Sequence, residues 1–210
     1  MTKEPPMDIM VDFETLGSGT RPYLMSVAVV LFDPNVIDDP TASFDLNRKF
    51  VRYFNYRAQP NRRVEIQSLL WWLSRGGGGG GEALMRQLNP PRSEQIIFSP
   101  YSFCVALNHF IRNSNFDQGC CSIWARGTDF DIRILQELYD DTSNSLEGTP
   151  VMPFWNQSNI QDVRTLLKSA RLSKSLNPNP HDPLQDCLFQ IYDVQQALSI
   201  LANQRKSTMP

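Results

Sequence analysis

The sequence predicts an α/β protein built on a mixed β-sheet, an antiparallel meander plus parallel strands, flanked by helices. Two observations lead to this class. Short apolar runs with strand periodicity come first along the chain, and segments with helical spacing then alternate with further short strands. The chain has 210 residues and no evident internal repeat, so we expect one domain over residues 1–210, with a core from about residue 8 to residue 200.

The first three predicted strands come from apolar periodicity. Apolar and mostly acidic positions alternate over residues 7–14, which is typical of a strand with one buried face. Residues 24–32 form a nearly continuous apolar run, typical of a strand that is buried on both faces. Turn residues at 33–40 predict an antiparallel connection to a third strand over residues 44–54.

Helices and short strands alternate in the rest of the chain. Apolar residues at helical spacing predict a first helix over residues 64–75, and six glycines at 76–81 end it. We interpret these glycines as a flexible surface loop, because no Lys and no Ser or Thr follows them as in a phosphate-binding loop. The other predicted elements are helices over residues 103–111, 130–139, 162–170 and 183–201 and strands over residues 122–125 and 153–155.

Composition excludes two classes of protein. No apolar run approaches the length of a membrane span, and 20 basic against 22 acidic residues exclude nucleic-acid binding through global charge. We expect free thiols in a reducing compartment, because the cysteines lack Cys-x-x-Cys spacing and are too sparse for a disulfide framework. The N-terminus does not read as a secretory signal, so we expect a cytoplasmic protein without membrane contact.

The first candidate for chemistry is a pair of carboxylates on the first predicted strand. Asp12 and Glu14 are two residues apart, so their side chains project from the same face. Two neighbouring carboxylates repel each other unless a cation is present, and hard oxygen ligands are what Mg²⁺ and Mn²⁺ prefer. The alternative interpretation is a solvated strand end.

Asp131 is a second candidate, placed where a predicted strand passes through a short turn into a helix. Ligands gather at such strand ends in open sheets. The spacing from Thr128 to Asp131 also matches a capping box with Asp in place of Glu, and Asp129 could equally be the cap or a ligand. The sequence leaves these interpretations open.

A third candidate begins the last predicted helix. Asp182 is a good N-cap and a proline follows it at the first helical position. His181 and Asp186 then occupy the two positions that meet in a hydrophobic staple, so they should lie close together. His181 can take a proton from water, and Asp186 can bind a metal. The alternative is a histidine that only packs at the helix entry.

These motifs together resemble the DEDDh branch of the 3'-5' exonuclease superfamily, whose fold is ribonuclease H-like. The residues that carry the resemblance are Asp12-Phe13-Glu14-Thr15-Leu16, Phe130-Asp131 followed by Ile134-Leu135, and His181 with Asp186. A narrower resemblance, to the phage exonuclease A-like and bacterial 3'-5' exoribonuclease group, rests on Leu70-Trp71-Trp72-Leu73, Trp124 and Asp162-Val163-Arg164-Thr165. The likeness spans about residues 8 to 200.

The resemblance implies a metal-dependent 3'-5' exonuclease that releases nucleoside 5'-monophosphates from the 3' ends of single-stranded RNA or DNA by a two-metal mechanism. It implies two divalent ions, Mg²⁺ or Mn²⁺, with His181 as the general base. The implied metal ligands are Asp12, Glu14, Asp131 and Asp186, and the implied substrate contacts are Thr15, Leu16, Trp72 and Arg164. The alternative function is a catalytically inert nucleic-acid-binding or interaction protein with this fold.

The resemblance also implies a bacterial or phage-infected host cytosol, and it leaves the oligomeric state open, with a homodimer among the alternatives. A basic segment adds a possible contact with nucleic acid. It contains Arg48, Lys49, Arg52, Arg57, Arg62 and Arg63, no acid, and interleaved aromatic residues. Such a segment is typical of sequence-independent binding of single strands, and the alternative is an edge strand protected by charge.

Overall fold

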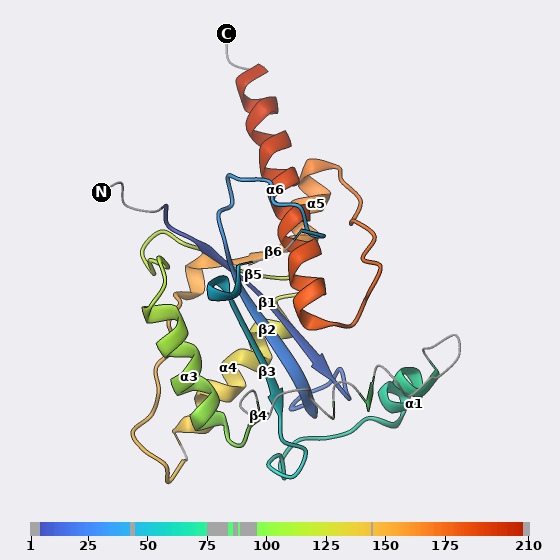
Figure 1. Ribbon diagram of the computed structural model, residues 1–210, viewed down its shortest axis with the longest axis vertical. Helices are drawn as coiled ribbons and strands as arrows, with labels where there is room; N and C mark the ends of the chain where they lie inside the picture. Colours follow the sequence, from blue (N-terminus) through green and yellow to red (C-terminus); the bar gives the residue numbers. More distant parts are fainter. Residues whose placement is uncertain are drawn as a thin grey trace.

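The computed structural model describes residues 5–42, 45–74, 84–85, 88, 96–143 and 145–207. Within these residues a six-stranded sheet has the order β4-β3-β2-β1-β5-β6 (Figure 1). Its strands are β1 (Asp8–Thr15), β2 (Leu24–Phe32), β3 (Lys49–Phe54), β4 (Ile96–Ile97), β5 (Ile123–Ala125) and β6 (Ile160–Asp162). β1, β2 and β3 pair antiparallel and the other pairs are parallel, so the predicted mixed sheet is confirmed.

Helices cover both faces of the sheet. They are α1 (Ile66–Ser74), α3 (Pro100–Arg112), α4 (Asp131–Thr142), α5 (Val163–Ala170) and α6 (Pro183–Ser207), with 3-10 turns η1 (Leu46–Arg48) and η3 (Gln157–Asn159). Side chains of α3 and α4 share one buried cluster with the sheet, and side chains of α5 and α6 share another. No helix of the described residues has the length and apolar character to cross a lipid bilayer.

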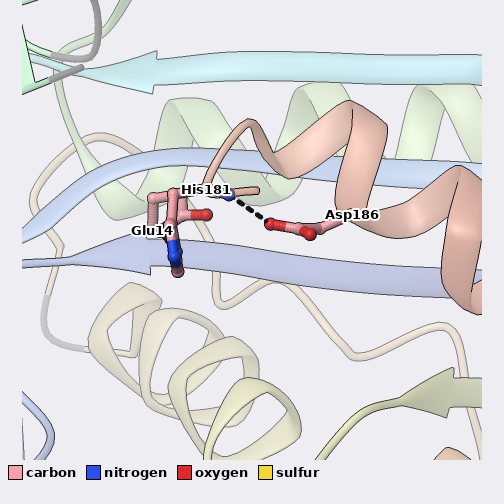
Figure 2. Close-up of side chains that lie close together, drawn as sticks. All are labelled: Glu14, His181 and Asp186. Atoms are coloured by element: carbon pink, nitrogen blue, oxygen red, sulfur yellow. Dashed lines mark hydrogen bonds and ion pairs between the residues drawn. The ribbon is translucent and has the colours of Figure 1, made fainter. Parts of the chain in front are cut away.

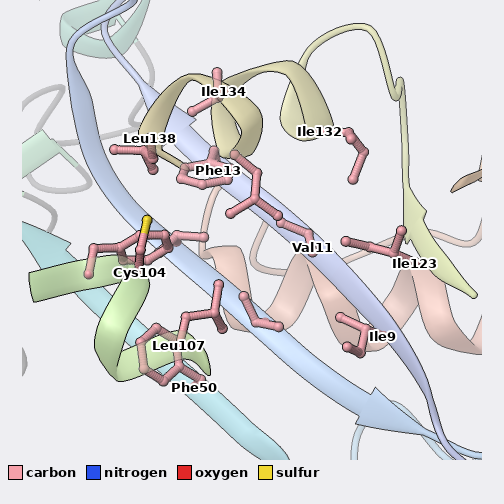
Figure 3. Close-up of a cluster of buried hydrophobic side chains, with 14 of the residues drawn as sticks. Ile9, Val11, Phe13, Phe50, Cys104, Leu107, Ile123, Ile132, Ile134 and Leu138 are labelled. Atoms are coloured by element: carbon pink, nitrogen blue, oxygen red, sulfur yellow. The ribbon is translucent and has the colours of Figure 1, made fainter. Parts of the chain in front are cut away.

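Strand alternation decides what each face of β1 carries. Ile9, Val11 and Phe13 pack against α3 and α4 (Figure 3). Met10 packs against α5 and α6, so Asp12 lies on that second face as well. Burial of apolar side chains of this size stabilises the fold by roughly 1.5–3 kcal/mol each, so these contacts hold the position of β1 firmly. All nine residues of β2 are buried, as the apolar run predicts.

One edge of the sheet collects strand ends and helix starts. β1, β3, β4, β5 and β6 run in the same direction and β2 runs against them. The carboxyl ends of β1, β5 and β6 therefore meet at the same edge, where α4 and α5 also begin. This is the position at which open α/β sheets bind ligands.

Two sequence predictions need correction. The strand predicted at residues 153–155 is wrong, because this segment has no regular structure and its Trp155 packs on Tyr139, with ring centroids 5.2 Å apart. Aromatic residues favour strands mainly through packing, and here they pack from a loop. The third strand begins at Lys49 rather than at residue 44, because Asp45 caps the 3-10 turn that precedes it.

Two other predictions have different outcomes. The four cysteines are free thiols, as expected from their spacing: Cys104, Cys120, Cys121 and Cys187. The glycine run at residues 76–81, interpreted as a flexible loop, lies outside the described residues. The single domain over residues 1–210 stays a prediction.

Candidate active site

The carboxyl end of β1 carries two acidic side chains on one face. Asp12 pairs with Ala28 and Glu14 pairs with Ser26 across the β1–β2 ladder, and the register becomes irregular directly after Glu14. Neighbours as small as Ala28 and Ser26 leave room in front of both carboxylates. Glu14 is 7% exposed and Asp12 is half-buried, so neither is a freely solvated strand end.

Asp131 reaches the same end of β1 from α4. It is the first residue of α4, its side chain is buried, and its Oδ1 accepts a hydrogen bond of 3.0 Å from the backbone N–H of Phe13. The residue before it, Phe130, is the N-cap and makes no side-chain cap bond. The capping interpretation of Asp131 is therefore not observed, and its carboxylate instead joins α4 to β1.

The start of α6 brings His181 and Asp186 together, as the capping pattern predicts. Asp182 caps the helix, since its Oδ1 accepts the backbone N–H of Gln185 at 3.0 Å. Asp186 accepts the His181 backbone N–H at 2.7 Å through Oδ2 (Figure 2). Its Oδ1 accepts the Asn177 side-chain amide at 2.8 Å. The backbone of His181 has φ 71°, a left-handed conformation that is uncommon for residues other than glycine. Asp186 thus holds a strained turn in place.

The His181 imidazole lies between β1 and α1. Its Nδ1 is 4.0 Å from Glu14 Oε2, and Figure 2 shows both side chains at the end of β1. Its ring centroid is 4.7 Å from that of Trp71 and 5.6 Å from that of Trp72, with the rings nearly perpendicular. The Trp72 indole N–H in turn donates to the backbone oxygen of Thr15 at 3.0 Å. The two tryptophans therefore restrict the orientation of the histidine.

The donor atoms at this place suit a divalent cation. Glu14, His181 and Asp186 each offer one ligand atom, and these atoms lie within 4.8 Å of one another. Asp12 and Asp131 line the same cavity as these three residues. Carboxylate oxygens are the ligands that Mg²⁺ and Mn²⁺ prefer, so the carboxylates present fit such an ion.

The electrostatics of the site favour the same conclusion. The pKa of Asp12 is raised well above its usual value, first by burial and then by the neighbouring charges of Asp131, Glu14 and Asp186. Burial also raises the pKa of Asp131 to about 7, although the hydrogen bond from Phe13 and the nearby Arg164 oppose the shift. Carboxylates held together against their own repulsion need added positive charge to stay ionised.

A cavity of about 620 Å³ opens in front of these groups. Three cationic side chains line the same cavity, those of Arg126, Arg164 and Lys174. Arg164 lies across Gly127, whose φ of 110° favours glycine and whose added Cβ would come within 3.0 Å of the guanidinium. Acidic and basic side chains thus line one cavity.

The structure places the four positions that the resemblance assigns to substrate in different surroundings. Among the described residues of that set, only Arg164 lines the cavity. Leu16 is 5% exposed and packs with Trp72, and Thr15 donates its hydroxyl to the backbone of Gly17. Trp72 is 2% exposed whereas Trp71 is 38% exposed, so Trp71 is the more accessible of the two, and a substrate contact of Trp72 stays a prediction.

Sequence reasoning missed two side chains that hold the site together. Gln190 donates to Asp12 and lies on the same face of α6 as Asp186, four residues earlier. That spacing is a signal that could have found it. Asn177, which donates to Asp186, lies in an irregular loop where no periodicity marks it.

The basic segment at residues 48–63 divides between structural and exposed roles. The Arg62 side chain is 4% exposed and lies 3.5 Å from Glu137 and 3.7 Å from Asp141, so it belongs to a buried ion-pair network. The Arg52 guanidinium stacks over the Phe50 ring at 4.0 Å. Binding of single strands by this segment stays a prediction, and Arg62 is not available for it.

Comparisons with known proteins agree with this geometry. A family model of the 3'-5' exoribonuclease Rv2179c-like domain matches residues 7–198. The exodeoxyribonuclease of Enterobacteria phage T4 is 28% identical in an alignment that covers 91% of this chain and 88% of that protein.

Solved structures show the same fold at low sequence identity. The zinc-bound complex of E. coli exonuclease I with single-stranded DNA has a TM-score of 0.53 and 13% identity, and the match covers 98% of this chain and 42% of that one. S. pombe Pop2p, in a form that contains Mg²⁺ and Mn²⁺, has a TM-score of 0.50 and 10% identity, with 91% and 82% covered. The fold of this chain is ribonuclease H-like, as the sequence resemblance implies.

Proposed function

We propose that this chain, which belongs to the 3'-5' exoribonuclease Rv2179c-like domain family, removes nucleotides one at a time from the 3' ends of single-stranded RNA or DNA. One observation carries the proposal. Side chains from β1, the start of α4 and the start of α6, far apart in sequence, converge on one cavity with the donor set of a divalent-metal site. The products would be nucleoside 5'-monophosphates.

Four carboxylates would hold the metal ions. Asp12 would be shared between two ions, with Glu14 and Asp186 on one and Asp131 on the other. Two Mg²⁺ or Mn²⁺ ions supply charge stabilisation for the attacking and leaving oxygens of an in-line displacement. The raised pKa values of Asp12 and Asp131 support this assignment, because only added positive charge allows both carboxylates to stay ionised near neutral pH.

His181 would accept the proton of the attacking water. Its side chain is 28% exposed, so water reaches it, while Asp186 holds its backbone and the Trp71 ring restricts its orientation. A general base must be held within reach of the proton that it takes, and these contacts hold this one beside Glu14.

The cationic side chains of the cavity would bind the nucleic-acid backbone. Arg126, Arg164 and Lys174 line the cavity together with the carboxylates and suit phosphate oxygens. Thr15 and Leu16 would support the terminal nucleotide from the end of β1. Both RNA and DNA are candidate substrates, because the matching family is described as exoribonuclease and the phage T4 relative as exodeoxyribonuclease. A cytoplasmic location is part of the proposal, since the cysteines are free thiols.

Matched RNA and DNA oligonucleotides test the proposal. Each carries a 5' label and either a free or a blocked 3' end, and is incubated with the purified chain and Mg²⁺ or Mn²⁺. We expect stepwise shortening of free 3' ends that stops with EDTA. Saturable binding without metal-dependent shortening under any salt condition would instead favour an inert binding protein.

A further inference from the structure

We infer that Gln190 is a positioning residue of this active site, which holds one oxygen of Asp12 and leaves the other to the metal ions. The inference rests on the proposed function and adds to it a residue that neither the motifs nor the family resemblance marks. Gln190 lies in α6, its side chain is 5% exposed, and its Nε2 donates to Asp12 Oδ1 at 2.8 Å.

Helix periodicity explains how Gln190 reaches this position. Asp186, Gln190 and Asp193 are spaced four and three residues apart, so they share one face of α6, and all three line the cavity. α6 thereby supplies a metal-ligand candidate from its first turn and the support of a second ligand from the next turn. The bond joins residues 178 positions apart in sequence.

Asp12 needs this support because of its surroundings. Asp131, Glu14 and Asp186 all repel a negative charge on Asp12. Among the hydrogen bonds of the described residues, the one from Gln190 is the side-chain donor that opposes this repulsion. A carboxylate that two ions share must keep one orientation, and a neutral amide fixes the orientation without adding a competing positive charge.

The other end of the Gln190 amide points to the same role. Because a carboxylate accepts hydrogen bonds, Nε2 must face Asp12, and this fixes the direction of Oε1. Within the described part of the chain, Oε1 is buried and has no hydrogen-bond partner. A buried acceptor without a donor destabilises a fold, so its presence calls for an explanation. A hydrated cation, which brings O–H donors into a cavity lined by carboxylates, suits such an acceptor.

A second buried glutamine in α6 provides a matched control. Gln195 is 1% exposed, its Oε1 accepts the Asp38 backbone N–H at 3.0 Å, and its Nε2 donates to Asp33 O at 2.9 Å and to Asp38 Oδ2 at 2.8 Å. Both ends of this amide are satisfied by the loop after β2. Gln195 is therefore structural, whereas Gln190 has one partner that belongs to the active site.

The test compares Gln190→Met with Gln195→Met in the full chain. The dissociation constant of Mn²⁺ is measured by titration calorimetry without nucleic acid, and the unfolding temperature is measured in EDTA. We expect Gln190→Met to weaken Mn²⁺ binding about 10- to 100-fold, the usual cost of removing a group that orients a metal ligand, with little change in unfolding temperature. Gln195→Met should lower the unfolding temperature and keep the Mn²⁺ affinity.

Activity measurements separate positioning from substrate binding. For Gln190→Met we expect the Mn²⁺ concentration for half-maximal kcat to rise while KM for the oligonucleotide stays the same. Gln190→Asn keeps the amide but is one methylene shorter, so it should show the same loss and serves if the methionine variant does not fold. Unchanged Mn²⁺ affinity in a folded Gln190 variant would overturn the inference and leave the proposed function intact. If the unmodified chain neither binds Mn²⁺ nor shortens an oligonucleotide, both are overturned.

Discussion

The two ends of β1 place acidic residues on the same face of one strand but surround them differently. At the start of β1, Asp8 accepts the backbone N–H of Ser122 and the indole N–H of Trp124, each at 2.8 Å and each on a separate oxygen. At the other end, Asp12 has one amide donor and three neighbouring carboxylates. Both carboxylate oxygens of Asp8 thus accept hydrogen bonds from the chain, and these bonds connect β1 to β5.

This difference shows how a structural carboxylate is distinguished from a functional one on the same strand. Burial raises the pKa of Asp8, its two hydrogen bonds oppose the increase, and a single carboxylate, that of Asp33, makes the smallest addition to it. Burial raises the pKa of Asp12 too, but there the neighbouring carboxylates add to the increase. Among the described residues no basic side chain lowers the pKa of Asp12, although Arg164 opposes the shift of Asp131. We therefore expect the balancing positive charge from a bound cation.

The largest expected effect comes from truncating one carboxylate at each end. Loss of a residue that supports a metal ligand lowers activity roughly 10- to 100-fold. Asp12→Ala removes a proposed ligand itself, so it should lower kcat by more than this. Asp8→Ala should keep the activity at saturating metal but lower the free energy of unfolding by about 2 kcal/mol, because two buried N–H donors lose their acceptor. Nuclease assays and urea unfolding of both variants check this. Equal losses of activity would show that the two ends do not differ in function.

A second prediction compares the two histidines. His181→Ala should lower kcat roughly 10²- to 10⁴-fold, the usual contribution of a general base. His109 lies exposed on α3 and contacts Asn113, so His109→Ala should leave kcat unchanged. Single-turnover assays with excess enzyme measure the chemical step directly. Full activity of the His181→Ala variant would show that His181 is not the general base.

A third prediction concerns the pH dependence of stability without metal. The pKa of Asp131 is raised to about 7 in the folded chain, and that of Asp12 is raised as well, against about 3.9 for an unfolded aspartate. The folded state therefore binds more protons, and the stability that these groups contribute at low pH is lost as pH rises through about 7. Unfolding temperatures in EDTA should fall between pH 5.5 and pH 8.

The control for this pH dependence removes the charges. Asp12→Asn and Asp131→Asn together should flatten the decrease and raise the unfolding temperature in EDTA at pH 8, because the repulsion is gone. Mn²⁺ should raise the unfolding temperature of the unmodified chain more at pH 8 than at pH 5.5. A decrease of the same size in the double variant would place its origin elsewhere in the molecule.

The smallest predicted effect concerns the cationic side chains that line the cavity. Arg164→Ala should raise KM for an oligonucleotide by about tenfold, the value of one charge-assisted hydrogen bond to phosphate, with kcat nearly unchanged. Lys168 is exposed on the same helix and does not line the cavity, so Lys168→Ala is the matched control. Initial rates over a range of oligonucleotide concentrations give both constants. An unchanged KM for Arg164→Ala would exclude this residue from substrate binding.

Local patterns predicted the features of this molecule that depend on neighbours in sequence. The buried strand at residues 24–32 has the predicted bounds, because a nearly continuous apolar run of that length is typical of a strand that is buried on both faces. The start of α6 followed from its cap, and the cap fixed the closeness of His181 and Asp186.

Features that depend on tertiary packing were not predictable in the same way. The contact of Trp71 with His181 requires the orientation of α1 on the sheet, which no local pattern sets. The bond from Gln190 to Asp12 requires α6 to lie across the end of β1. The strand predicted at residues 153–155 is absent because Phe154 and Trp155 pack from a loop, and aromatic residues favour strands mainly through packing.

The central claim is that divalent cations bind at the carboxyl end of β1 and not at its start. The most direct measurement is the number of Mn²⁺ ions bound per chain without nucleic acid, from the electron paramagnetic resonance signal of free Mn²⁺. The account predicts about two ions for the unmodified chain and for Asp8→Ala, as in two-metal nucleases, and a loss of tight binding for Asp12→Ala. Absence of Mn²⁺ binding, or equal binding by the Asp12→Ala variant, would contradict it.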